Sequence, residues 1–191
     1  MVEHINSINK KLLFGIIFLI FIIGCAQQQK QESRTQQTTE VINMHLTSSA
    51  FKHNGTMPSE FTCDGSNINP PLSITGVPAN AKSLVLIVDD PDAVVGVWDH
   101  WVVFNINPSI SEIKQDTQPQ GVAGKNSGGR NSYQGPCPPS GTHRYFFKLY
   151  ALDATLNLPE GSTKKQVEPV MQSHILTKSE LIGLYKRINN Q

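Results

Sequence analysis

The chain has 191 residues and a formal net charge of +1, and from His45 onward its acidic and basic residues are equal in number. This length suits one folded domain rather than two. The balanced charge argues against a nucleic-acid-binding protein, because contact with a phosphate backbone needs a net basic face.

The N-terminus has the pattern of an export signal. Lys10 and Lys11 end a polar segment, and residues 12–23 form an apolar run that is shorter than the roughly 20 residues needed to span a bilayer. The next residues, Gly24 and Cys25, resemble the end of a bacterial lipobox. Residues 1–24 are therefore predicted to be a lipoprotein signal peptide. Cys25 is predicted to be acylated, with palmitate-type chains that anchor the protein to a bacterial membrane, facing the periplasm or the exterior of the cell envelope.

A tether is predicted to follow the signal peptide. Residues 25–44 are rich in Gln and Thr and contain no aromatic residue. Such a segment cannot bury enough apolar surface to offset the entropy of ordering its chain. We therefore expect a disordered tether over residues 25–44 and a folded domain over residues 45–191.

Within the domain, three segments have the composition of buried strands: residues 83–89, 101–106 and 144–152. Residues 45–51 and 72–75 are weaker strand candidates. Two capping-box patterns, at Thr163 and at Thr177, predict helices over residues 166–174 and from residue 181 onward. The second helix is supported by the helical spacing of Leu181, Leu184, Tyr185 and Ile188. The domain is thus predicted to be mainly β with short C-terminal helices.

Four motifs follow one another between the strands: Asp90-Pro91-Asp92-Ala93, Trp98-Asp99-His100-Trp101, Gly135-Pro136-Cys137-Pro138-Pro139 and His143-Arg144-Tyr145. With these motifs the chain from about residue 45 to 187 resembles the phosphatidylethanolamine-binding protein family, in its bacterial Raf-kinase-inhibitor-like branch. The resemblance implies a Greek-key antiparallel β-sandwich with a small anion pocket at one end.

By the same resemblance, the pocket residues carry over position by position. They are Asp90, Trp98, His100, Gly135, Pro139, His143 and Tyr145. The implied ligand is a phosphate-like anion or a phospholipid head group, with no cofactor. One position departs from the family pattern: Val94 stands where Pro usually follows Asp-Pro-Asp-Ala, which puts the shape of the pocket wall in question.

Elementary chemistry agrees with such a pocket. An imidazole can donate to a phosphate oxygen and is tuned by a carboxylate, so Asp90 is expected to orient and charge His100. Tyr145 offers a hydroxyl donor, and Gly135 would let a backbone N–H approach an oxyanion. His143 and Tyr145 are two residues apart on one predicted strand and project to the same face.

Other chemistries have less support in the sequence. Asp90, His100 and His143 are a conceivable metal set, but no recognised metal-binding spacing accompanies them. No Gly-x-Ser-x-Gly nucleophile motif occurs, so the protein is not expected to be an enzyme. If chemistry occurs, His100 with Asp90 acting on a phosphate ester is the candidate.

Two cysteines remain after Cys25. In an exported protein two thiols without metal-binding spacing most often join, so Cys63 and Cys137 are expected to form a disulfide. It would tie the loop around residue 137 to the N-terminal part of the domain.

Three functions remain open from the sequence. The first is a membrane-anchored binding protein for a small anion or phospho-head group. The second is an inhibitor or regulator of an extracytoplasmic protein such as a protease, acting through rim loops within residues 115–131. The third is a weak phosphohydrolase or esterase. Binding is favoured over catalysis, because no nucleophile–base pair is evident.

Overall fold

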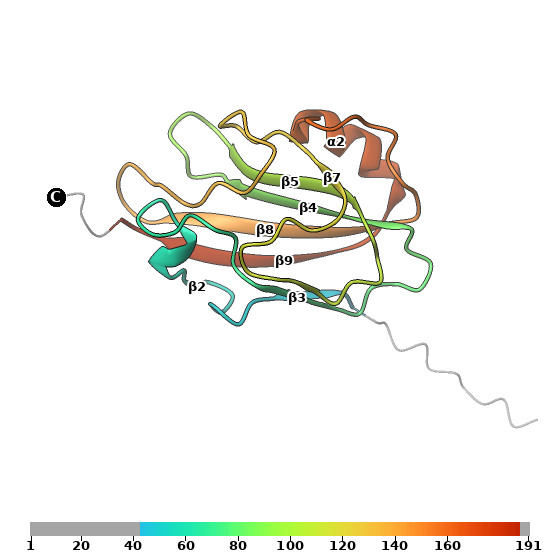
Figure 1. Ribbon diagram of the computed structural model, residues 1–191, viewed down its shortest axis with the longest axis horizontal. Helices are drawn as coiled ribbons and strands as arrows, with labels where there is room; N and C mark the ends of the chain where they lie inside the picture. The colour runs from blue at the N-terminus through green and yellow to red at the C-terminus, as the bar shows by residue number, and fades with distance from the viewer. Residues whose placement is uncertain (1–42, 188–191) are drawn as a thin grey trace, which may run out of the picture. The chain divides into compact units, whose positions relative to one another are not determined.

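The computed structural model describes residues 43–187, which form two β-sheets and a short helix (Figure 1). The smaller sheet has the order β1-β3-β6, with bounds His45–Thr47, Leu72–Thr75 and Glu112–Ile113. The larger sheet has the order β2-β9-β8-β4-β5-β7, with bounds Gly55–Thr56, Ile175–Tyr185, His143–Leu152, Ser83–Asp90, Trp98–Ile106 and Val122–Ala123. Its neighbouring strands are antiparallel, except that β2 runs parallel to β9. The predicted mainly β fold is confirmed.

Strand β4 is buried on both faces, as its continuous apolar run predicts. Leu84, Leu86 and Val88 belong to one apolar core, together with residues of β1 and β3 from the smaller sheet. Val85 and Ile87 point the other way, into a second core that includes Val167 and Met171 of helix α2 (Lys164–Met171). The alternation of the two sets is the period of a β-strand, so one strand supplies both layers.

Helix α2 is held against the larger sheet by ion pairs as well as by apolar packing. Lys164, at its first turn, contacts the carboxylates of Asp89 and Asp99, the latter at 3.3 Å. Asp89 is 1% exposed and also pairs with Lys148 of β8 at 2.9 Å. A carboxylate this deeply buried needs such partners, because an unpaired buried charge is strongly destabilising.

The first of the two predicted C-terminal helices is confirmed. The Thr163 N–H donates to Oε1 of Gln166 at 2.9 Å, one half of the predicted capping box. The helix ends at Met171 and continues as the 3₁₀ turn η2 (Gln172–His174); a second 3₁₀ turn, η1 (Ser59–Phe61), precedes β3.

The prediction of a second C-terminal helix is wrong, because residues 175–185 form strand β9. β9 pairs with β8 along its length and so covers an edge of β8 that would otherwise expose its backbone groups. Leu181, Gly183 and Tyr185 alternate onto the buried face, which is also a strand pattern. The fourth residue of the predicted helical stripe, Ile188, lies outside the described residues.

The predicted disulfide is present between Cys63 and Cys137, with the two Cα atoms 5.4 Å apart. It joins positions 74 residues apart in the sequence. Beside it, the Cys63 N–H donates to the Pro136 carbonyl at 3.0 Å, so the two loops also share a main-chain hydrogen bond.

Replacing both cysteines by serine is expected to lower the free energy of unfolding by about 4 kcal/mol, because the open chain regains the entropy that the cross-link removes. Urea unfolding of the oxidised protein and of the double variant measures the difference. Dithiothreitol should destabilise the native protein and leave the double variant unchanged. Equal midpoints for the oxidised and double-serine proteins would show that the bridge contributes no stability.

Candidate functional site

A pocket of about 230 Å³ opens at the end of the larger sheet where β4 ends and where β5 and β8 begin. Its wall comes from the end of β4 with the β4–β5 turn, from the starts of β5 and β8, and from the loop that carries the disulfide. Its lining residues are Asp90, Ala93, Val94, Val95, Trp98, His100, Gln134, Cys137, Pro138, Pro139 and His143. Of the seven pocket residues that the family resemblance implied, five therefore line one cavity.

A β-bulge places His100 in this pocket. Val88 pairs with Trp101 and Asp89 pairs with Asp99, so His100 is an extra residue in β5 with no partner on β4. A bulge of this kind re-aims a side chain that strict alternation would send elsewhere. The His100 ring packs edge-on against Tyr145, at 5.2 Å between centroids, on the face of the sheet that also carries His143.

The tautomer of His100 is set by a main-chain carbonyl. Nδ1 lies 2.6 Å from the Gln134 oxygen, and because a carbonyl only accepts, Nδ1 must carry the hydrogen. The side chain is 4% exposed. Burial lowers the pKa of His100 below its usual 6.5, against the opposing effects of the Gln134 hydrogen bond and of the carboxylates of Asp90, Asp89 and Asp99.

Asp90 does not orient His100, contrary to the expectation from the sequence. Its Oδ2 accepts from Nδ1 of His143 at 2.7 Å, and its Oδ1 accepts from the Asp92 N–H at 2.8 Å. Asp90 and His143 are 3% and 7% exposed, so this is a buried pair. The bulge directs His100 to the Gln134 carbonyl. The Asp90 carboxylate pairs instead with His143, at the start of β8.

Trp98 and Pro139 line the pocket as the resemblance implied, whereas Tyr145 and Gly135 have other roles. Tyr145 is 1% exposed and lies behind the histidine rings, and its hydroxyl makes no hydrogen bond with the described residues. Burial raises its pKa. Gly135 donates its N–H to Oδ1 of Asn67 at 2.7 Å, and a Cβ there would lie 2.6 Å from the Phe61 carbonyl. Gly135 thus permits close loop packing, and its N–H is already used.

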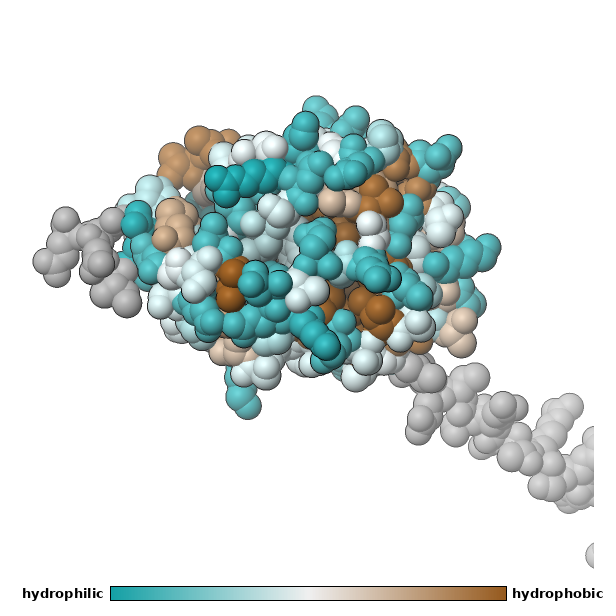
Figure 2. All heavy atoms as spheres, viewed as in Figure 1, coloured by the Kyte–Doolittle hydropathy of each residue, from teal (hydrophilic) through white to brown (hydrophobic). Residues whose placement is uncertain are grey.

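Two contributors to the pocket were not predicted from the sequence. The first is Gln134, whose main-chain carbonyl fixes His100; a main-chain acceptor leaves no side-chain signal in the sequence. The second is the exposed apolar rim formed by Val94 and Val95, which line the pocket mouth and are 84% and 79% exposed; of the two, only Val94 was singled out from the sequence, and not as part of an apolar surface. Apolar atoms gather in Figure 2 at the upper left, where Figure 1 draws the turn between β4 and β5. This rim occupies the place where the sequence departs from the family pattern.

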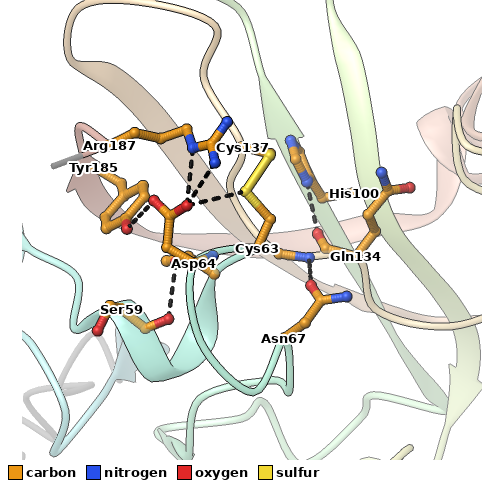
Figure 3. Close-up of a disulfide and its surroundings, with 11 residues drawn as sticks. Ser59, Cys63, Asp64, Asn67, His100, Gln134, Cys137, Tyr185 and Arg187 are labelled. Carbon is orange, nitrogen blue, oxygen red and sulfur yellow. Dashed lines mark hydrogen bonds and ion pairs between the residues drawn. A yellow bond between two sulfur atoms is a disulfide. The ribbon is translucent and has the colours of Figure 1, made fainter. Parts of the chain in front are cut away.

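The disulfide lies between the pocket and a polar cluster at the end of β9 (Figure 3). On one side are His100 and Gln134; on the other, Asp64 accepts from the Tyr185 hydroxyl at 2.7 Å and from Nε of Arg187 at 2.9 Å. The hydrogen bond from Arg187, followed by the one from Tyr185, lowers the pKa of Asp64. The bridge therefore joins the pocket loop to a segment that is itself anchored to β9.

Residues 43–187 contain neither a metal-binding cluster nor a membrane-spanning helix. No group of three or more His, Cys, Asp or Glu side chains there is arranged to hold a metal ion. No helix there is long and apolar enough to cross a bilayer. Cys25 and the predicted signal peptide lie outside the described residues.

Comparison with known proteins agrees with the fold. The family described as "Phosphatidylethanolamine-binding protein" matches residues 47–186. A UPF0098 protein of Methanothermobacter thermautotrophicus is 51% identical over 150 residues, which cover 75% of this chain and 99% of that protein. The chain belongs to the phosphatidylethanolamine-binding protein family.

Two solved structures extend the comparison. The crystal structure of a phosphatidylethanolamine-binding protein homolog from Chlamydia trachomatis superposes with a TM-score of 0.74 at 44% identity, covering 76% of this chain and 99% of that one. YbcL of E. coli, described as a new member of the mammalian PEBP family, superposes with a TM-score of 0.71 at 28% identity, with the same coverage.

The geometry of His100 predicts its titration. With its pKa held below 6.5, the folded protein binds fewer protons than the unfolded chain between pH 6.5 and the folded pKa. Stability therefore falls as the pH drops through that window. Nitrogen-15 NMR of the imidazoles should show His100 as the Nδ1–H tautomer with a midpoint below 6.5. A midpoint at or above 6.5, or the Nε2–H tautomer, would contradict this account.

Proposed function

We propose that the domain binds a small phosphate-bearing ligand in the pocket between β4, β5 and β8. The observation that carries the proposal is the pair of buried histidines, His100 and His143, held in fixed orientations at one cavity by Gln134 and Asp90. A rigid site lowers the ordering cost of binding, and the adjoining prolines and disulfide contribute to that rigidity. The family's name refers to a phospholipid, which supports a phosphate-bearing ligand in general but not one particular ester class.

The presence of Asp90 in an anion site is compatible with this proposal. Both of its oxygens already accept hydrogen bonds, one from His143 and one from the Asp92 N–H. Its charge is therefore partly neutralised within the protein, and its role is to orient His143. The cavity volume of about 230 Å³ suits a phosphate group with a small substituent better than a large ligand.

We further propose that the protein is an envelope lipoprotein, anchored through Cys25. The Cys63–Cys137 disulfide supports export, since such bonds persist mainly in oxidising compartments. Metabolic labelling with a palmitate analogue tests the anchor. Incorporation should be lost in Cys25→Ser, and labelling that persists in this variant would contradict the assignment.

One observation favours the alternative function, a protein partner. Val94, Val95 and Val97 are exposed within a single turn at the pocket mouth, at 84%, 79% and 55%. An inhibitor would use such an apolar rim as a contact surface. Two variants would separate the two functions. A pocket variant should lose phosphate binding and keep protease inhibition, whereas Val95→Ser should lose the inhibition.

Ligand binding is tested by NMR on the full chain in a neutral detergent. Addition of inorganic phosphate and then of phosphoethanolamine should shift the imidazole signals of His100 and His143 saturably. His174 is a matched control, because it pairs with Asp153 at an exposed position outside the pocket lining. His143→Ala should weaken binding at least tenfold. No saturable shift up to millimolar ligand, or equal shifts at His174, would overturn the proposed function.

A further inference from the structure

The pocket's histidines each have one ring nitrogen committed to the protein. Nδ1–H of His100 donates to the Gln134 carbonyl at 2.6 Å, and Nδ1–H of His143 donates to Asp90 at 2.7 Å. For each ring only Nε2 remains for a ligand. In a neutral imidazole whose Nδ1 carries the hydrogen, Nε2 is an acceptor.

Apart from the ring of His143, which is paired with Asp90, no described side chain that lines the pocket near His100 can carry a positive charge. Among the described residues that line it, none is Lys or Arg. Asp89 and Asp90 approach His100 from β4 and Asp99 from β5, while Tyr145 and His143 face it from β8. The other polar side chains in the lining, the Trp98 indole and the Gln134 amide, are neutral. Burial outweighs the three carboxylates and lowers the pKa of His100, so this ring is mostly neutral near pH 7.

A fully deprotonated phosphate in this pocket would face a lone pair on Nε2 of His100. A phosphate monoester avoids the repulsion, because its second pKa is about 6 and it can keep a P–OH group that donates to Nε2. A phosphodiester has no P–OH and would need the buried imidazole itself to become charged.

We propose that the pocket selects phosphate monoesters over phosphodiesters and binds the monoester together with one proton shared between a phosphate oxygen and Nε2 of His100. This inference rests on the proposed phosphate-binding function and narrows its ligand class. It involves no covalent step: the proton enters with the ligand or from solvent and leaves when the ligand dissociates.

The test is calorimetry on the full chain in neutral detergent, with methyl phosphate as the monoester and dimethyl phosphate as the diester. Titrations in buffers of different ionisation enthalpy count the protons taken up. For methyl phosphate the uptake should approach one above about pH 6, with affinity falling about tenfold per pH unit. Dimethyl phosphate should bind at least tenfold more weakly near neutral pH.

Two further measurements identify the group responsible. His100→Gln puts a neutral amide donor near the position of Nε2, so proton uptake and the preference for monoester should both diminish; His174→Gln is the matched control and should behave as the native protein. The second measurement uses the native protein with methylphosphonate, whose second pKa is higher than that of methyl phosphate. Its loss of affinity should begin at a correspondingly higher pH.

The outcomes separate the two proposals. Binding without proton uptake, or equal affinity for the diester, overturns monoester selection and leaves the phosphate site standing. An onset of affinity loss that is the same for methylphosphonate and methyl phosphate also overturns it. Absence of binding by every ligand at every pH overturns the phosphate-binding function itself, and monoester selection with it.

Discussion

The pocket depends on the β-bulge between β4 and β5. Elsewhere in β5 the side chains alternate between the two cores, with Trp101 and Val103 on one face and Val102 and Phe104 on the other. Strict alternation would place His100 with Val102, toward helix α2. The extra residue reverses this and sets His100 beside Tyr145, on the face that carries His143. Without the bulge the two histidines would lie on opposite faces of the sheet, and no shared site would exist.

The two adjacent carboxylates at the end of β4, Asp89 and Asp90, have different roles. Asp89 faces α2, where its ion pairs with Lys148 and Lys164 help hold the helix to the sheet. Asp90 faces the other way and orients His143. Two identical side chains, one residue apart, thus serve the fold and the candidate site respectively. The disulfide adds a third constraint, since it fixes the loop of Cys137 that forms the opposite wall.

Much of this arrangement could be predicted from the sequence, and the failures have physical causes. The three apolar runs identified the central strands, and the two internal cysteines identified the disulfide. The helix predicted after Thr177 failed because Leu181, Leu184 and Tyr185 fit a helical stripe as well as a strand, and only the open edge of β8 decides between them. The pairing of Asp90 with His143 was missed because a bulge shifts the register without leaving a pattern in the sequence. Likewise, the Gln134 carbonyl that fixes His100 belongs to the main chain, which sequence motifs do not report.

His100 and His143 are proposed to form one anion site. The most direct test of this proposal is a crystal structure of the protein grown with inorganic phosphate. The account predicts a tetrahedral anion within hydrogen-bonding distance of Nε2 of both His100 and His143, with the Gln134 and Asp90 contacts to Nδ1 retained. A phosphate bound elsewhere while this pocket stays empty, or a His100 ring turned so that Nδ1 faces the anion, would contradict it.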